Sequence, residues 1–591
     1  MAEKQTNVTS TQKAPNTMVK LMRYIKPLWG ILFAIVLFSL VGSVLSIIIP
    51  TFFRDIVDKT QDGIVHGFDV ATIMNDIYIS LALLAGSFVC NLIQSYIAPL
   101  LSQRMAQRMR RDTNQKANKI PLNYFDTTPA GEILSTMTND IDTLSTSFSS
   151  TLPMLVTATA MLVGCTVLMF VTNAVLAVTT IIASLLGMVL SGIILSKGAP
   201  YFKKNQDLIA ELNSLVNEDI QGHLVIKAFN AEQETTKAFD DTNRELFDST
   251  WRTQFVSALM APLSIFASSL SYIFVCVVGA MLVFTGNTQI GTIVAFIVYA
   301  QLFATPISEI AQSAGTIQPA IAAGSRIFSV LEQDEMEDEG TTPVDTQTVR
   351  GEVDFDHVAF GYNPSNIIVH DFSCHVEPGQ KVAIVGPTGA GKSTLINLLT
   401  RFYEVNDGDI RIDGTSIYDM SRETLHDTIS MVLQETWTFE GTMRDNIVYS
   451  KKGVSDEEVW SVVEQCGLGD YVRASADGLD TMIGEDAGLS AGQKQLVTIA
   501  RAMLDGAPIL ILDEATSSVD TRTEAVISAA IDKLMEGRTS FVIAHRLSTI
   551  KNADKILVLK DGDIIETGTH DELMAKGGFY ADLYMSQFDT N

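Results

Sequence analysis

The chain has 591 residues, which is enough for two or more domains, and 47% of them are hydrophobic although the formal net charge is −27. These two features separate along the chain: residues 1–335 carry 21 basic and 25 acidic side chains, whereas residues 336–591 carry 20 and 43. The excess of acidic residues in the second half argues against nucleic acid as a partner. The five cysteines lack CxxC spacing and indicate neither a disulfide framework nor a metal site.

The first half contains long apolar segments that predict membrane spans. Residues 1–18 form a polar tail without the apolar core of a signal peptide. Beyond the tail, four segments carry no charged residue: 27–53, 77–103, 143–196 and 253–308. A helix needs roughly 20 apolar residues to cross a bilayer, so each of the two longer segments predicts two spans, with turns at Asn173 and Gly286. We therefore expect six transmembrane helices. A buried helix of a soluble protein explains any one segment but not all of them.

The charges that flank the spans predict their orientation. Six basic residues lie between Arg104 and Lys119, after the second span, whereas five aspartates lie between Asp55 and Asp76, after the first. Because basic loops stay in the cytoplasm, we expect both termini there and a multi-pass location in the cell membrane. The two cytoplasmic loops are long, polar and patterned like helices, which predicts spans that continue beyond the bilayer.

The spans themselves say little about the transported substrate. Their apolar centres contain no lysine, arginine, aspartate or glutamate, so neither a charged substrate nor a proton path is favoured. Phe296, Tyr299 and Phe303 fall on one face of the last span. Two interpretations of this face stay open, which are the lining of an apolar cavity and packing between helices.

The second half contains a glycine-rich loop of the G-x-x-x-x-G-K-S type, which is typical of a phosphate-binding site. The loop follows an apolar run, Val382–Val385, and precedes a predicted helix that starts at Thr394. Its glycines let backbone N–H groups face phosphates, and the helix N-terminus adds partial positive charge. Lys392 is expected to reach the β- and γ-phosphates, and Ser393 to ligate Mg²⁺. The loop consists of Gly386, Pro387, Thr388, Gly389, Ala390, Gly391, Lys392 and Ser393.

Two further apolar runs end in residues suited to phosphate hydrolysis. Residues 509–512 read as a buried parallel strand that delivers Asp513 and Glu514 to its carboxyl end. Asp513 is expected to hold Mg²⁺ and Glu514 to polarise the attacking water, although two surface acids after a core strand are the plainer interpretation without the loop. Residues 540–544 form a second such strand, which ends at His545.

These motifs together resemble the ATP-binding cassette (ABC) family. Residues 386–393 match its Walker A motif, and residues 489–493 match its LSGGQ signature except for Ala491. The resemblance implies ATP and Mg²⁺ as cofactors, Glu514 as catalytic glutamate and His545 as switch histidine. It also implies that Gln434 is the Q-loop glutamine, which is a further catalytic residue and a further Mg²⁺ ligand. Residues expected to contact nucleotide outside the loop are Tyr362, which stacks on adenine, Thr394, Ser490, Gly492, Gln493 and Asp520.

The long loops of the first half carry a second resemblance. Residues 120–142 look like the first intracellular loop of ABC exporters, and residues 212–230 like the second. In the family each loop carries a short coupling helix that presses on a nucleotide domain. We therefore expect Phe125 and Asp126 to contact such a domain near Gln434. The chain shows no internal duplication, which predicts a half-transporter that must dimerise.

The expected fold is an α-helical transmembrane bundle of six spans fused to a C-terminal α/β P-loop nucleotide-binding domain. The expected boundaries are a tail at 1–18, the bundle at 19–330, an acidic linker at 331–348 and the nucleotide-binding domain at 349–591. The expected function is ATP-driven export of a small hydrophobic or amphipathic substrate, a drug or a lipid, across a bacterial cell membrane. An importer of a siderophore-like substrate and a nucleotide-gated regulator or channel are the alternatives.

The variant signature bears on the partner. In the family, Ala491 in place of glycine beside an otherwise complete site resembles one half of a heterodimeric exporter with unequal sites. We expect a heterodimer with a second half-transporter, and a homodimer that tolerates the alanine is the alternative.

Overall fold

The computed structural model describes residues 14–336, 340–346, 348–363, 366–434, 436–484, 488–513, 521–544 and 547–588. The chain forms two compact units. A helical unit comprises Met1–Asn118 and Ala130–Gln333, and a cassette unit comprises Lys119–Pro129 and Asp334–Asn591. Each unit is described by itself.

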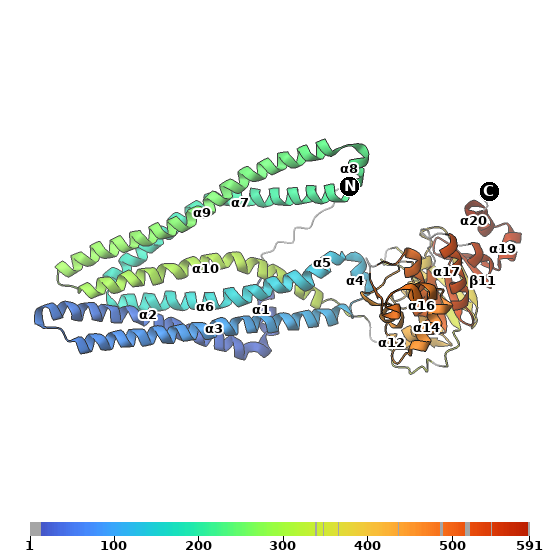
Figure 1. Ribbon diagram of the computed structural model, residues 1–591, viewed down its shortest axis with the longest axis horizontal. Coiled ribbons are helices and arrows are strands. Elements are labelled where there is room, and N and C mark those ends of the chain that lie inside the picture. Colours follow the sequence, from blue (N-terminus) through green and yellow to red (C-terminus); the bar gives the residue numbers. More distant parts are fainter. Residues whose placement is uncertain are drawn as a thin grey trace. The chain divides into compact units, whose positions relative to one another are not determined.

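The helical unit consists of long helices that run beside one another (Figure 1). Five helical stretches among the described residues are long and apolar enough to cross a membrane, and the sixth predicted span falls on α9, whose apolar part, Ser268–Phe284, is shorter. Helix α1 begins within the residues that the sequence assigns to the tail. The elements are α1 (Ala14–Tyr24), η1 (Lys26–Leu28), α2 (Trp29–His66), α3 (Val70–Ala117), α5 (Ala130–Ser135), η2 (Thr136–Asp140), α6 (Ile141–Thr172), α7 (Ala174–Gln221), α8 (His223–Phe229), α9 (Glu232–Phe284) and α10 (Ile290–Leu331).

Both predicted turns between paired spans are confirmed. Asn173 separates α6 from α7, and its side chain caps α7 by accepting hydrogen bonds from the N–H groups of Val175 and Leu176, each at 3.1 Å. Gly286 lies between α9 and α10 with φ +72°, a conformation that glycine adopts without strain. Helix α3 has 48 residues, which corresponds to about 72 Å and far exceeds the hydrocarbon core of a bilayer. The prediction that helices continue beyond the bilayer is therefore confirmed.

Packing inside the helical unit explains the aromatic face of the last span. Phe296 and Tyr299 are fully buried and Phe303 is 6% exposed, in a cluster with Cys165 and Met169 of α6. Of the two interpretations, packing between helices is therefore the correct one for this face. Every long helix of this unit also contains proline in its interior: Pro50, Pro99, Pro153, Pro200, Pro262, Pro306 and Pro319.

The cassette unit contains two larger sheets and surrounding helices. A six-stranded sheet has the order β12-β11-β3-β10-β9-β6, in which only the edge strand β12 runs antiparallel to its neighbour. A four-stranded antiparallel sheet has the order β2-β1-β4-β5. The strands are β1 (Val353–Phe360), β2 (Val369–Val376), β3 (Lys381–Val385), β4 (Asp407–Ile412), β5 (Thr415–Ser416), β6 (Ile429–Val432), β7 (Gly441–Thr442), β8 (Met482–Ile483), β9 (Ile509–Asp513), β10 (Thr539–Ile543), β11 (Lys555–Lys560) and β12 (Asp563–Gly568).

Short helices surround these sheets (Figure 1). They are α4 (Leu122–Thr127), α11 (Lys392–Leu399), α12 (Arg422–Asp427), α13 (Met443–Val448), α14 (Asp456–Gln465), α15 (Gly469–Ala474), η3 (Gly478–Asp480), α16 (Ala491–Asp505), α17 (Thr521–Leu534), α18 (Leu547–Lys551), α19 (His570–Lys576) and α20 (Phe579–Phe588). Helix α4 belongs to this unit although it comes from the first long loop of the first half.

The inner strand β9, which lies between β10 and β6, shows why its sequence is a continuous apolar run. Ile509 and Ile511 pack into one core cluster, whereas Leu510 and Leu512 pack into another. Successive side chains of a strand point to opposite faces, so a strand covered on both faces needs no polar alternation. The strands predicted at 382–385, 509–512 and 540–544 are all present as β3, β9 and β10, and these parallel strands end at the same edge of the sheet.

Candidate nucleotide site and coupling helices

The glycine-rich loop joins β3 to α11 in a conformation that demands glycine. Gly389 and Gly391 have φ of +85° and +93°, where a side chain is strained. At Gly386, an added Cβ would lie 2.3 Å from the carbonyl oxygen of Leu559, so the loop packs directly against β11. The loop therefore has the close backbone packing and the helix N-terminus that a phosphate group needs.

Lys392 reaches back across this loop. Its Nζ donates hydrogen bonds to the carbonyl oxygens of Gly386 at 2.8 Å and Pro387 at 2.9 Å. Burial lowers the pKa of Lys392, and the charge of Asp513 acts in the opposite direction. The lysine is thus held over the loop with the Asp513 carboxylate in electrostatic reach, an arrangement that fits a phosphate with an accompanying cation.

The carboxyl ends of three parallel strands meet beside the loop. Ile543 of β10 is paired with Asp513 of β9 and with Ile384 of β3, so these strands end at the same edge. Ser393 is exposed in the first turn of α11, and Gln434 is exposed just after β6. Hydroxyl, carboxylate and amide oxygens are the ligands that Mg²⁺ prefers, so the chemistry of Ser393, Asp513 and Gln434 fits this ion. Glu514, Asp520 and His545 lie outside the described residues.

An aromatic cluster lies beside the start of α11. Tyr362, which follows β1, places its Oη 3.3 Å from the Oγ1 of Thr394 in α11. The rings of Phe360 and Tyr403 contact the Tyr362 ring edge to face, with centroids 5.1 and 5.0 Å away. Tyr362 remains 43% exposed, so part of its surface is free to stack on a base. We call Phe360, Tyr362 and Tyr403 the aromatic cluster.

The signature residues form a helix start. Ser490 caps α16: its Oγ accepts from the N–H of Gln493 at 3.2 Å, and its own N–H donates to Oε1 of Gln493 at 2.9 Å. Gly492 is buried, whereas Ala491 is exposed in the first turn. The exposed N-terminus of a 15-residue helix carries partial positive charge, which suits an anionic ligand.

Comparison with known proteins identifies the family. The model of the ABC transporter transmembrane region matches residues 32–307, and the model described as ABC transporter matches residues 369–517. The fatty acid ABC transporter ATP-binding/permease protein of Mycobacterium tuberculosis is 39% identical over 516 residues, which cover 87% of this chain and 82% of that protein. The chain belongs to the ABC transporter family.

Other relatives place this ABC transporter among bacterial exporters. A probable multidrug resistance transporter of Bacillus subtilis is 35% identical over 84% of this chain and 74% of its own length. An ATP-dependent lipid A-core flippase of Acinetobacter baylyi is 31% identical over 97% of this chain and 98% of its own. The chain is therefore an exporter-type, multi-pass membrane protein whose ATPase drives transport. One transmembrane region and one cassette make the architecture of a half-transporter, which implies dimerisation.

Both predicted coupling segments contain a short helix in the transporter, α4 and α8. In the cassette unit, the Oη of Tyr403 donates a hydrogen bond to Oδ2 of Asp126 in α4. The expected contact between Asp126 and a nucleotide domain is thus confirmed, with Tyr403 as the partner. The expected position of this contact near Gln434, and the contact of Phe125, stay predictions. In the helical unit, α8 exposes Leu224, Val225 and Phe229.

Tyr403 is the residue that sequence reasoning missed. It lies in an Arg-Phe-Tyr-Glu segment after α11, and neither its distance from the other motifs nor its residue type indicates a role. The available signal was an aromatic residue shortly after the helix that follows the phosphate loop.

Proposed function

We propose that this transporter exports a hydrophobic or amphipathic substrate, a lipid or a lipid-like drug, across the bacterial cytoplasmic membrane. The observation that carries the proposal is the absence of lysine, arginine, aspartate and glutamate from the apolar centres of the predicted spans. The relatives named for fatty acid and lipid A-core transport support it. The proposal also keeps the bundle at 19–330, the linker at 331–348 and the cassette domain at 349–591, with both termini in the cytoplasm.

The nucleotide chemistry follows from the residues at the sheet edge. In the proposal, Tyr362 stacks on adenine, the loop from Gly386 to Thr394 surrounds the phosphates, and Lys392 contacts the β- and γ-phosphates. Ser393, Gln434 and Asp513 hold Mg²⁺, which neutralises charge on the transferred phosphoryl group. Glu514 orients and polarises the attacking water, and His545 and Asp520 complete the site.

The dimer completes each site with residues from the other subunit. Ser490, Gly492 and Gln493 are proposed to meet the γ-phosphate held by the partner, through the N-terminus of α16. The exposed methyl group of Ala491 lies at this helix start and crowds that approach. We therefore infer a heterodimer in which this chain's Lys392 and Glu514 serve the competent site with the partner's signature.

Reconstituted transport tests the proposed function. The purified chain, alone and co-expressed with candidate half-transporters, is placed in proteoliposomes with a fluorescent fatty acid, a fluorescent phospholipid or a cationic dye. ATP-dependent export of at least one amphipathic probe is expected, and Lys392→Ala should abolish it by removing the phosphate-facing charge. Uptake in the opposite direction, or no movement of any probe with any partner while ATP is hydrolysed, would refute the proposal. Full activity of the chain alone would refute the requirement for a heterodimer.

A further inference from the structure

Tyr403 touches both the proposed adenine side of the nucleotide site and the first coupling helix. Its ring lies edge to face against Tyr362, with an interplanar angle of 89°, and against Phe360 at 5.7 Å. Its hydroxyl group donates to Asp126, 277 residues earlier in the chain. We propose that Tyr403 is a positioning residue that transmits the presence of a base on Tyr362 to α4 through its hydrogen bond to Asp126.

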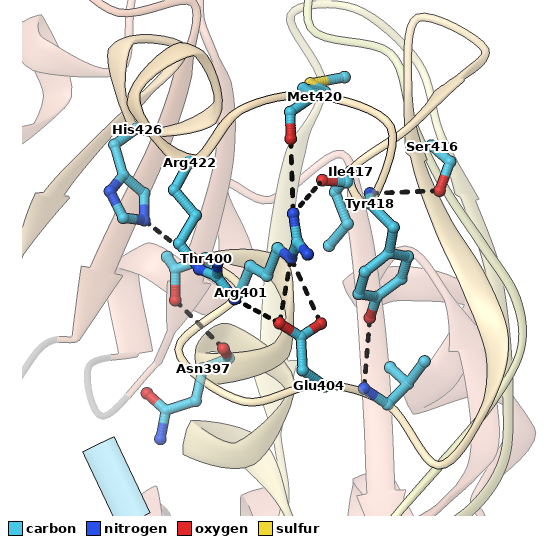
Figure 2. A network of polar contacts seen from close by, with 11 residues as sticks. Asn397, Thr400, Arg401, Glu404, Ser416, Ile417, Tyr418, Met420, Arg422 and His426 are labelled. Atoms are coloured by element: carbon cyan, nitrogen blue, oxygen red, sulfur yellow. Dashed lines mark hydrogen bonds and ion pairs between the residues drawn. The ribbon is translucent and has the colours of Figure 1, made fainter. Parts of the chain in front are cut away.

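The backbone on both sides of Tyr403 is fixed by a buried polar network (Figure 2). Arg401, only 3% exposed and with φ +53°, donates from Nη1 to the carbonyl oxygens of Ile417 at 3.2 Å and Met420 at 3.4 Å. Its Nε lies 3.2 Å from the Glu404 carboxylate, which also accepts from Nη2 of Arg422 at 2.5 Å. With residues 401 and 404 both anchored, Tyr403 has a rigid base from which its side chain reaches outward. We call Arg401, Glu404 and Arg422 the clamp.

The hydrogen bond from Tyr403 reaches α4 near its C-terminal end, at Asp126. The helix has six residues and buries none of them. Burial and the neighbouring Asp126 carboxylate raise the pKa of Tyr403, so the hydroxyl group stays protonated and remains a donor at any working pH. A hydrogen bond to a charged acceptor is stronger than one between neutral groups. Loss of this one bond is therefore expected to free α4 from the aromatic cluster.

The aromatic cluster makes the bond sensitive to nucleotide. The Tyr362 ring packs edge to face with the Tyr403 ring, and the Tyr362 hydroxyl group is hydrogen-bonded to Thr394. A base that stacks on the exposed surface of Tyr362 therefore limits the positions that the rings of Tyr362 and Tyr403 can take. The base thereby narrows the orientations of the Tyr403 hydroxyl group that can reach Asp126. Since the base position is part of the proposed function, this inference rests on that proposal.

The test compares Tyr403→Phe with Tyr471→Phe in the full chain in lipid nanodiscs. Tyr471 packs against a different core cluster of the same unit and serves as the matched control. In wild type and in the control, ATP with Mg²⁺ is expected to lower deuterium uptake by residues 122–127. In Tyr403→Phe this protection should be lost, while the ATP dissociation constant stays within about twofold because the ring is kept. Asp126→Ala should behave like Tyr403→Phe, and the double variant should add nothing.

A second readout separates this inference from the proposed function. If the wild type moves a fluorescent phospholipid in proteoliposomes, Tyr403→Phe should lower transport per ATP hydrolysed by about fivefold or more while ATP hydrolysis persists. A wild type without transport but with ATP-dependent protection of residues 122–127 would overturn the export proposal and leave the link intact. If ATP protected residues 122–127 from deuterium uptake in Tyr403→Phe as much as in wild type, the proposed link between the base and α4 would be overturned. A tenfold loss of ATP affinity would also overturn it, because Tyr403 would then belong to the base site itself.

Discussion

Neutralising Glu404 provides a quantitative test of the clamp. The Glu404 carboxylate contacts two arginines whose side chains are 2% and 9% exposed, Arg401 and Arg422. Removing one partner of a buried ion pair costs about 3–5 kcal/mol, because the other charge stays buried without compensation. Glu404 is 27% exposed and Arg401 keeps two carbonyl acceptors, so we expect Glu404→Gln to lower the free energy of unfolding by about 2–3 kcal/mol.

The expected loss is large enough to measure on the full chain. For a unit of this size, 1 kcal/mol shifts the Tm by about 2–4 °C, so a loss of about 2–3 kcal/mol in Glu404→Gln should lower the Tm of the cassette unit by about 4–12 °C. Thermal unfolding followed by intrinsic fluorescence gives the shift, and hydrogen exchange should place the loosened segment at residues 401–422. The matched control is Glu423→Gln, an exposed acid of α12 one residue beyond Arg422. Equal Tm values for the two variants, within about 1 °C, would show that the clamp does not stabilise this segment.

Three further predictions concern catalysis, topology and pH. Glu514→Gln should lower ATP turnover by about a hundredfold or more while nucleotide binding persists, and turnover within about twofold of wild type would exclude Glu514 as the catalytic base. In a background without other cysteines, a cysteine at Asp62 should react with an impermeant thiol reagent from outside the cell and one at Gln115 should not; the reverse pattern would invert the proposed orientation. Hydrogen bonding to Asp371 raises the pKa of His357, so this pair stabilises the fold fully below about pH 6.5 and less as pH rises through the raised value. Titration by NMR should show this pKa returning toward its ordinary value in Asp371→Asn.

The parts of the fold that were predictable are those that depend on local sequence. Asn173 divides an apolar run, and one polar residue able to cap a helix is enough to place a turn there. Asp513 follows four apolar residues, and a strand buried on both faces has few other possible sequences. The glycines of the phosphate loop were informative because their backbone conformations exclude other residues.

The parts that sequence could not predict depend on contacts between distant segments. Helical spacing places Phe296 and Tyr299 on one face, but it does not say whether a cavity or another helix meets that face; the structure shows neighbouring helices. Likewise, the resemblance led us to expect a contact between Asp126 and a nucleotide domain, but it did not point to Tyr403 as the partner. No periodicity links residues separated by 277 positions, so only the folded chain reveals this pair.

The prolines inside the long helices have a consequence for how the helical unit changes shape. Proline has no N–H to donate to the carbonyl group one turn earlier, so each of these helices lacks a backbone hydrogen bond at every interior proline, two of them in α10. A bend at that place breaks no further bond, whereas a bend elsewhere in a membrane would expose a carbonyl group to lipid. The long helices of this unit are therefore expected to bend at their prolines and to stay straight between them. Nucleotide binding can then act by shifting the populations of these bent conformations, because bending at a proline breaks no further backbone hydrogen bond.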